Sequence, residues 1–248
     1  MNTFKLGKLP RRFHPHTLAL ADYLTPQLPA PRGWINWEQA VRVPWEMMLN
    51  DSLGDCVWAA GGHSIMVWSA NAGIIFVPTD SEILVGYEST GYTPSDPSTD
   101  QGTVITQMLA YWRDTGLAGH KIAGWAEFDP TNRTHFKQAI QLFGCAFIGV
   151  QIRQSDMDAT NAGQPWTPHT DAVIGGHGVT VAGYGATGVW LVTWGQLQYA
   201  TWTWIEQNCD EAYGICTSDF IAAQGRSPSG FNLSQLQQDL IALKWQPA

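Results

Sequence analysis

A cysteine and a distant histidine are the residues of this chain whose types and surroundings suit nucleophilic chemistry. Cys56 follows a Gly54-Asp55 turn and opens an apolar, alanine-rich segment that predicts a helix. The positive end of a helix dipole favours the thiolate, which is the nucleophilic form of cysteine. His177 lies in a Gly-Gly-His-Gly sequence at the start of a strand-like apolar run. A thiol on a helix and an imidazole on a strand together predict a Cys–His pair for covalent catalysis.

Such a pair also needs hydrogen-bond donors for the oxyanion that forms during acyl transfer. The backbone N–H of Cys56 can supply one donor, and the side-chain amide of Asn50, six residues upstream, can supply a second. Asp55 is expected to cap the helix, although its charge would otherwise oppose a neighbouring thiolate. His63, on the same helix, is expected to pack in the core, and Asp171 is expected to be a loop residue rather than the partner of the histidine.

Helices are predicted in the first half of the chain and strands in the second. Apolar periodicity and stop signals predict helices over residues 56–72, 81–86, 103–115 and 131–143, and a terminal helix over about 231–244. Apolar runs and alternation predict strands over residues 146–152, 178–184, 188–193 and 199–205. This order indicates an α+β fold with two facing lobes, a helical lobe over about 45–144 and an antiparallel β lobe over about 145–217.

The first 44 residues differ from the rest in their proline content. Six prolines in this stretch predict an extended arm that wraps the body or a partner. A releasable propeptide is the alternative interpretation of the same stretch.

Composition excludes several classes of function. The net charge is −8, and no basic run extends beyond Arg11-Arg12, so nucleic-acid binding is not expected. No apolar run of the ~18 residues that a membrane helix needs is present, and the N-terminus lacks the apolar core of a signal peptide. A cytoplasmic or virion-associated protein is therefore expected rather than a classically secreted one.

The remaining cysteines give little indication of a cofactor. No Cys-x-x-Cys or His-x-x-x-His pair is present, so a metal site is not expected, and no other cofactor is expected either. Cys209 and Cys216 could bridge a hairpin in an oxidising setting, or both could be free thiols.

The residues around Cys56 and His177 resemble those of the papain-like cysteine peptidases. Asn50 stands where that family has a glutamine six residues before the catalytic cysteine, and Gly54 matches a family glycine. Residues 177–185 are similar to the histidine block of the family, including its Gly-Tyr-Gly turn. The similarity covers roughly residues 45–217, and it implies a two-lobed fold with the cysteine helix in one lobe and the histidine in the other. The Asn-x-x-x-Gly-Asp-Cys pattern also looks like papain-like proteins of bacterial and phage genomes.

The resemblance also implies roles for residues outside the pair. Gln101 and Gly102 precede a helix, as the segment that lines the substrate groove does in the family, and Trp194 is expected to shield the histidine. The asparagine that orients the histidine in the family is missing. Alignment on the Trp-Gly pair places Val192 at that position, whereas counting from His177 places Thr193 there.

Two functions follow from these observations. The first is a thiol hydrolase that cleaves peptide or isopeptide bonds of a peptide or protein substrate through a Cys56 acyl-enzyme, with His177 as base. The alternative is a catalytically impaired papain-like protein that serves as a structural or assembly module, for example in a phage particle, with the N-terminal arm contacting its partner.

Overall fold

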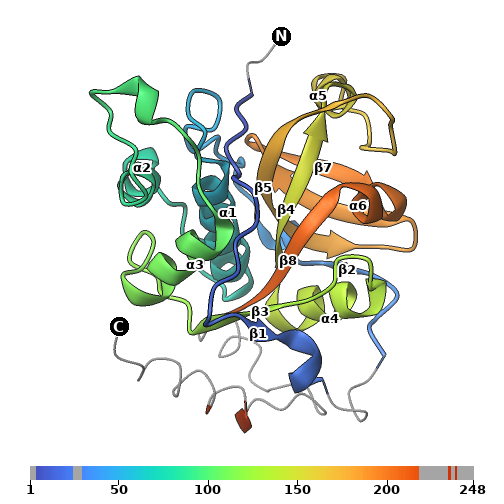
Figure 1. Cartoon of the computed structure of the whole chain (residues 1–248). Helices are drawn as coiled ribbons and strands as arrows, with labels where there is room; N and C mark the ends of the chain where they lie inside the picture. Colours follow the sequence, from blue (N-terminus) through green and yellow to red (C-terminus); the bar gives the residue numbers. More distant parts are fainter. Residues whose placement is uncertain (1–3, 25–29, 218–233, 236–237, 239–248) are drawn as a thin grey trace.

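A computed structural model describes residues 4–24, 30–217, 234–235 and 238 of the chain (Figure 1). It shows a mixed α+β fold, as predicted. The α-helices are α1 (Cys56–Asn71), α2 (Asp80–Glu88), α3 (Ile105–Asp114), α4 (Arg133–Phe143), α5 (Gln154–Asn161) and α6 (Trp202–Asn208). Short 3-10 helices are η1 (Leu20–Tyr23), η2 (Trp37–Ala40) and η3 (Pro97–Thr99).

One sheet contains all eight strands: β1 (Leu18–Ala19), β2 (Ile35–Asn36), β3 (Gly124–Glu127), β4 (Ala146–Arg153), β5 (Val173–Tyr184), β6 (Gly188–Thr193), β7 (Gln196–Thr201) and β8 (Cys209–Cys216). The strand order is β1-β3-β8-β4-β5-β6-β7, and β2 pairs with β5. Every pairing is antiparallel except that of β1 with β3. The long central pair β4–β5 therefore forms the framework on which His177 is placed.

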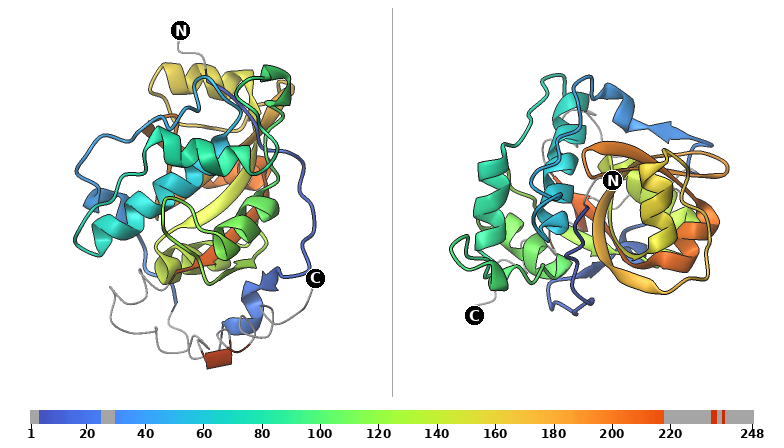
Figure 2. Two further views of the ribbon diagram at one scale, coloured as in Figure 1. Left: turned by 90° about the vertical axis from the view of Figure 1, so that its left-hand side faces the viewer. Right: turned by 90° about the horizontal axis from the view of Figure 1, so that it is seen from above.

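The apolar residues form two cores, one on each side of this framework. One core gathers around α1, α2 and α3, and the other around β4–β7 with α4 and α6. Figures 1 and 2 show the same division, with the three helices on one side and the curved sheet on the other. The β4–β5 pair and α1 meet at the boundary, so the start of α1 and the middle of β5 lie next to each other.

Helix α1 is the central helix of the helical lobe. Its residues from Cys56 to Trp68 are all buried. A helix that is apolar or small on every side is suited to burial within a core rather than to a surface position. The burial fixes α1 on all sides and gives its first turn a defined position against β5.

The predicted strand over residues 199–205 is wrong in its second half. Strand β7 ends at Thr201, and α6 begins at Trp202. The hydroxyl of Thr201 accepts a hydrogen bond from the backbone N–H of Trp204, which caps the new helix. The alternation of aromatic residues was misleading because Trp202 and Trp204 are both buried on the short helix, against different neighbours.

Of the two alternatives for Cys209 and Cys216, the structure shows free thiols and not a hairpin disulfide. The two residues are the first and last of the single strand β8, and both are free thiols. Seven residues of extended strand separate Cα atoms by roughly 23 Å, far beyond the reach of a disulfide.

The predicted terminal helix over 231–244 lies almost entirely outside the described residues. Across the described part of the chain, no helix combines the length and the apolar character that crossing a bilayer requires. Residues of the N-terminal arm contribute β1, η1, β2 and η2, so much of this stretch is incorporated into the fold.

Candidate active site

Cys56 and the residue that follows His177 are in contact where α1 abuts β5. Cys56 is the first residue of α1, and the side chains of Cys56 and His177 are almost completely buried. The backbone N–H of Gly178, the residue after the histidine, donates to Cys56 Sγ at 3.3 Å. A side chain at Gly178 would press against Val57, because its Cβ would lie 3.0 Å from a Val57 methyl group. The glycine therefore permits the close approach of the histidine strand to the cysteine helix.

Thr193 orients the imidazole. Its Oγ1 lies 2.5 Å from His177 Nε2, and Trp194 stacks on the ring at a centroid distance of 4.3 Å. Of the two candidates for the orienting position, the structure brings Thr193, and not Val192, to the histidine. The other ring nitrogen, Nδ1, is buried and makes no hydrogen bond. Nδ1 is thus the nitrogen that remains available for proton exchange with a thiol.

Asn50 lies upstream of α1 and is buried. Its Nδ2 donates to Leu53 O at 3.1 Å and, more weakly, to Lys5 O at 3.4 Å. The second contact joins this amide to a backbone carbonyl near the N-terminus of the chain.

Asp55 occupies the N-cap position of α1 but makes no side-chain cap hydrogen bond, which corrects the predicted role. It is fully buried, and burial raises the pKa of its carboxyl group well above the ordinary value. The charge of Asp55, where it is present, contributes to the raised pKa of the neighbouring Cys56 thiol.

A hydrogen-bond network through Asp100 holds the helical wall of the cleft. Asp100 Oδ1 accepts from Gly54 N–H at 2.9 Å and from the Tyr87 hydroxyl at 2.5 Å. The Tyr87 hydroxyl accepts in turn from Gly102 N–H at 2.9 Å. Gln101 lies between these residues, but its side chain is exposed and donates to Ser98 O. The network therefore fixes Gly54 and Gly102, while the Gln101 side chain is directed elsewhere.

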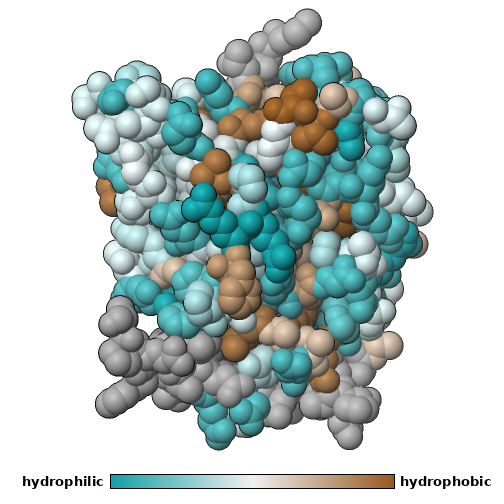
Figure 3. All heavy atoms as spheres, in the orientation of Figure 1, coloured by the Kyte–Doolittle hydropathy of each residue, from teal (hydrophilic) through white to brown (hydrophobic). Residues whose placement is uncertain are grey.

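Residues 4–9, which we call the strap, run through the cleft between the two lobes. The strap bonds to both walls through its backbone: Lys5 N to Asn50 O, Lys8 N to Gly176 O, Leu9 N to Thr103 O, and Thr103 N to Gly7 O, at distances of 2.8–3.0 Å. In Figure 1 it is the dark blue segment descending between α1 and β5. The space-filling view of this face shows side chains across its middle rather than an open groove (Figure 3).

Glycines permit the strap to lie so deep. A Cβ atom on Gly7 would lie 1.8 Å from Gly54 O, so no other residue fits at this position without movement. Gly102 has a positive φ of 81°, and a Cβ there would lie 2.0 Å from Gly7 O. The three glycines bring backbone against backbone directly beside Cys56.

The strap turns a backbone N–H, and not a carbonyl, towards the thiol of Cys56. The Gly7 carbonyl is bonded to Thr103 N–H, whereas the Gly7 N–H is close enough to Cys56 Sγ to lower its pKa. A thiolate attacks a carbonyl carbon, so a strap that offers an N–H is not positioned to be cleaved.

Covering the site keeps the pair uncharged. Burial raises the pKa of Cys56 to about 12, although the N–H groups of Gly178 and Gly7 partly offset the effect. Burial likewise lowers the pKa of His177 to about 3, with a smaller contribution from His63. At neutral pH the covered site therefore holds a thiol and a neutral imidazole, because charged forms lack solvation there.

Two further expectations concern nearby histidine and aspartate residues. His63 is buried, and its Nε2 bonds to Glu46 O at 2.8 Å, which agrees with a packing role. Asp171 is a loop residue that accepts from Ser155 N–H and Oγ, away from the imidazole.

Several residues of the site escape prediction from sequence. Phe4 stacks on Trp194 at 4.7 Å, and Trp194 Nε1 donates to Lys5 O at 3.1 Å, so Trp194 holds the strap as well as covering the imidazole. Tyr87 and Thr103 likewise carry no motif of their own. For this wall of the cleft, the sequence indicated only the segment around Gln101 and Gly102, which directly follows Asp100.

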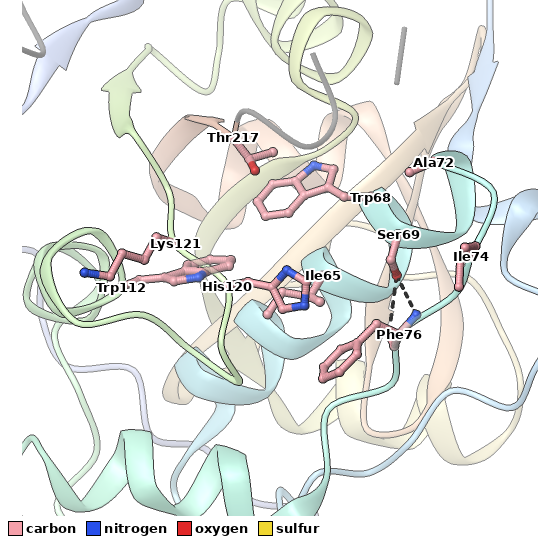
Figure 4. A pocket seen from close by; sticks show the side chains of 10 residues that line it. All are labelled: Ile65, Trp68, Ser69, Ala72, Ile74, Phe76, Trp112, His120, Lys121 and Thr217. Carbon is pink, nitrogen blue, oxygen red and sulfur yellow. Dashed lines mark hydrogen bonds between the residues drawn. The ribbon is translucent and has the colours of Figure 1, made fainter. Parts of the chain in front are cut away.

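A separate hollow of about 270 Å³ lies on the helical lobe, next to the second half of α1 (Figure 4). Its lining is mainly apolar, with Trp68, Phe76 and Trp112 prominent, and Ser69 bonds to the backbone of Phe76. None of the predicted site residues lines it. The described residues also contain no group of three or more histidine, cysteine, aspartate or glutamate side chains arranged to hold a metal ion.

Solved structures with the same arrangement of lobes are cysteine proteases. Xylellain from Xylella fastidiosa superposes with a TM-score of 0.66 at 14% identity, over 87% of this chain and 97% of its own. The fold is papain-like. A cysteine protease of Carica candamarcensis in complex with E-64 gives a TM-score of 0.55 at 13% identity, over 75% of this chain and 99% of its own. A ragweed pollen allergen, a cysteine protease in its proform, gives 0.61 at 12% identity, over 88% of this chain and 75% of its own.

Sequence comparison adds nothing to this likeness. No family model matches the chain, and no curated protein does. The papain-like fold is thus shared with solved structures that are only 12–14% identical to this chain.

Proposed function

We propose that the chain is a papain-like cysteine peptidase that cleaves peptide or isopeptide bonds and is held inactive by its own strap. The observation that carries the proposal is the contact of Cys56, at the start of α1, with Gly178, which follows a His177 ring that is bonded to Thr193. Solved structures of the same fold are cysteine proteases by their descriptions, and one of them is a proform.

The chemistry assigned to these residues is acyl transfer. After the strap leaves, His177 Nδ1 takes the proton of the Cys56 thiol, and Sγ forms a bond to the carbonyl carbon of the substrate. The Asn50 amide and the Cys56 N–H stabilise the oxyanion. As the C–N bond breaks, the imidazolium gives its proton to the leaving amine. Water then hydrolyses the thioester and restores the thiol.

Uncovering the site is the step that activates the pair. Solvent that enters with strap release reduces the desolvation that now raises the pKa of Cys56 and lowers that of His177. Both shifts favour the uncharged pair, so their relief favours the thiolate–imidazolium form.

The test uses the full chain with Gly7→Ala, because a methyl group at this position cannot coexist with Gly54 O. We expect a thiol-directed epoxide or iodoacetamide to modify Cys56 at neutral pH at least ~10-fold faster than in the unaltered chain, as read by peptide mass spectrometry. Adding His177→Ala should suppress this reaction. Gly33→Ala is the matched control, since nothing lies within 4 Å of a Cβ at that exposed glycine.

The two functions give different outcomes in this experiment. If Cys56 in the Gly7→Ala chain reacts no faster than the buried thiol of Cys145, the peptidase proposal is wrong. The papain-like assembly module would then be the better description. Circular dichroism of both variants checks that the fold is retained.

A further inference from the structure

The side chain of Lys8 fills a closed acidic pocket in the β lobe. Its Nζ lies 2.8 Å from both carboxylate oxygens of Asp210 and 2.9 Å from Glu211 Oε1. The side chains of Lys8 and Glu211 are entirely buried, whereas that of Asp210 is 33% exposed. A lysine ammonium is thus taken out of water and matched by two carboxylates.

The walls of the pocket fit an unbranched chain that ends in a cation. Gly149 of β4 lines the methylene stem, and a Cβ there would lie 2.3 Å from Lys8 Cε and 2.7 Å from Glu211 Cγ. On β8, the Tyr213 hydroxyl donates to Glu211 Oε2 at 2.7 Å, and on β4 Gln151 Nε2 donates to Asp210 Oδ2 at 2.6 Å. The carboxylates are therefore held in place by neighbours other than Lys8.

The pocket belongs to the cleft rather than to the core. Lys8 enters it from the strap, and its backbone N–H bonds to Gly176 O, one residue before His177. Gly7, the neighbour of Lys8, is the residue that lies over the thiol. When the strap leaves, the pocket opens one residue away from the nucleophile.

An emptied pocket would leave Glu211 as a buried carboxylate without a counter-charge. Removing one partner of a buried ion pair is unfavourable for the charge that remains. A cation of similar shape can therefore restore the counter-charge of Glu211 that Lys8 now supplies.

We propose that this pocket selects a lysine or arginine side chain of the peptide substrate, with Glu211 as the specificity-determining residue and Lys8 as its internal mimic. That the bound residue belongs to a substrate rests on the proposed function, whereas the affinity of the pocket for an alkylammonium group does not. The residue bound there is expected to adjoin the one whose carbonyl is attacked.

The first arm of the test measures binding without catalysis. In the full chain with Lys8→Ala, millimolar n-butylammonium should raise the melting temperature, and n-butanol at the same concentration should not. The unaltered chain, whose pocket is filled, should show no such difference. Adding Glu211→Gln should abolish the shift, and Asp210→Asn, at the more exposed carboxylate, should weaken it.

The second arm measures selectivity in the Gly7→Ala chain. Fluorogenic peptides carry lysine, norleucine or glutamate in turn at each of the three positions before the cleaved bond. At one of these positions, we expect kcat/KM to be at least ~10-fold higher for lysine than for its uncharged isostere norleucine. With Glu211→Gln, we expect the ratio of the two kcat/KM values to fall to within about twofold.

The outcomes separate this inference from the proposed function. Cleavage of all peptides without a lysine preference overturns the specificity while the peptidase stands. Absence of any cleavage counts against the peptidase, and the butylammonium shift then decides alone whether the pocket binds cations. If butylammonium and butanol shift the melting temperature equally, or if neither shifts it, the inference that the pocket binds cations is wrong.

Discussion

The Nε2 atom of His177 and the Oγ1 atom of Thr193 lie 2.5 Å apart, so a hydroxyl group occupies the place where the papain-like family has an amide. Thr193 is the last residue of β6, which pairs with β5, the strand that carries His177. A hydroxyl can donate or accept, whichever tautomer the imidazole adopts. The contact therefore holds the ring without fixing its protonation state.

Replacing this hydroxyl should slow catalysis rather than abolish it. Thr193→Val keeps the shape and removes one hydrogen bond, so we expect kcat/KM to fall by roughly 5–10-fold, equivalent to ~1 kcal/mol. The measurement is made in the Gly7→Ala chain, together with the pH dependence of the rate. Thr193→Ser keeps the hydroxyl and should preserve both rate and pH profile. Equal losses in the two variants would show that Thr193 acts through packing alone.

The stacking of Phe4 on Trp194 should determine how firmly the strap is held. Phe4→Ala removes an aromatic pair whose contribution is ~0.5–1.5 kcal/mol, so alkylation of Cys56 should accelerate by roughly 2–10-fold. Phe13→Ala, at a side chain that is 76% exposed, is the control and should leave the rate unchanged. Identical rates for both variants would mean that this stack does not hold the strap.

The Tyr87 hydroxyl should stabilise the helical wall of the cleft. Tyr87→Phe leaves Gly102 N–H without its acceptor and removes a donor to Asp100, so we expect the free energy of unfolding to fall by ~1–3 kcal/mol. Chemical denaturation measures the change. Tyr92→Phe is the matched control, because Tyr92 stacks on Tyr87 at the edge of this network. A loss as large for Tyr92→Phe would show that the effect is not specific to the Tyr87 hydroxyl.

Glu38 should make the stability of the protein depend on pH. Burial raises its pKa from 4.5 to about 7, so the folded state keeps a proton that the unfolded chain has released. The stabilisation that comes from the protonated Glu38 carboxyl group is fully present below pH 4.5 and is lost as the pH rises through 7. Glu38→Gln should therefore change stability little at pH 4 and should stabilise at pH 8, by ~1–2 kcal/mol after allowance for residual solvent access.

Denaturation of both proteins at the two pH values measures this difference. The other buried acids, including Asp55, are common to both proteins and cancel in the comparison. A gain of the same size at pH 4 and pH 8 would contradict the titration of Glu38.

Local signals in the sequence explain the parts of the fold that were predicted. Helix α2 starts at a reciprocal Thr79–Glu82 capping box, and α4 ends at Gly144 with a φ of 80°, as a left-handed C-cap requires. The Cys56 and His177 motifs were visible because glycines surround them. Alternation failed at α6, where the Thr201 cap outweighed a strand-like pattern.

The strap and its pocket could not be predicted in this way, because their contacts are not local. Lys8 meets Asp210 across 202 positions, and Trp194 meets Lys5 across 189. Neither Lys8 nor Glu211 belongs to a motif, and a lysine in a proline-rich arm reads as a solvated charge. Pairings of this kind follow from topology and are visible only in three dimensions.

Because the N–H rather than the carbonyl of Gly7 faces the thiol, the strap can act as an inhibitor that is not consumed. It is joined to the same chain, so its effective concentration at the cleft is on the order of millimolar, and a competing peptide must exceed that level to enter. Opening is then a first-order event whose rate does not change with dilution. If the proposed peptidase function holds, activity would depend on whatever draws the first residues away and not on the concentration of the protein.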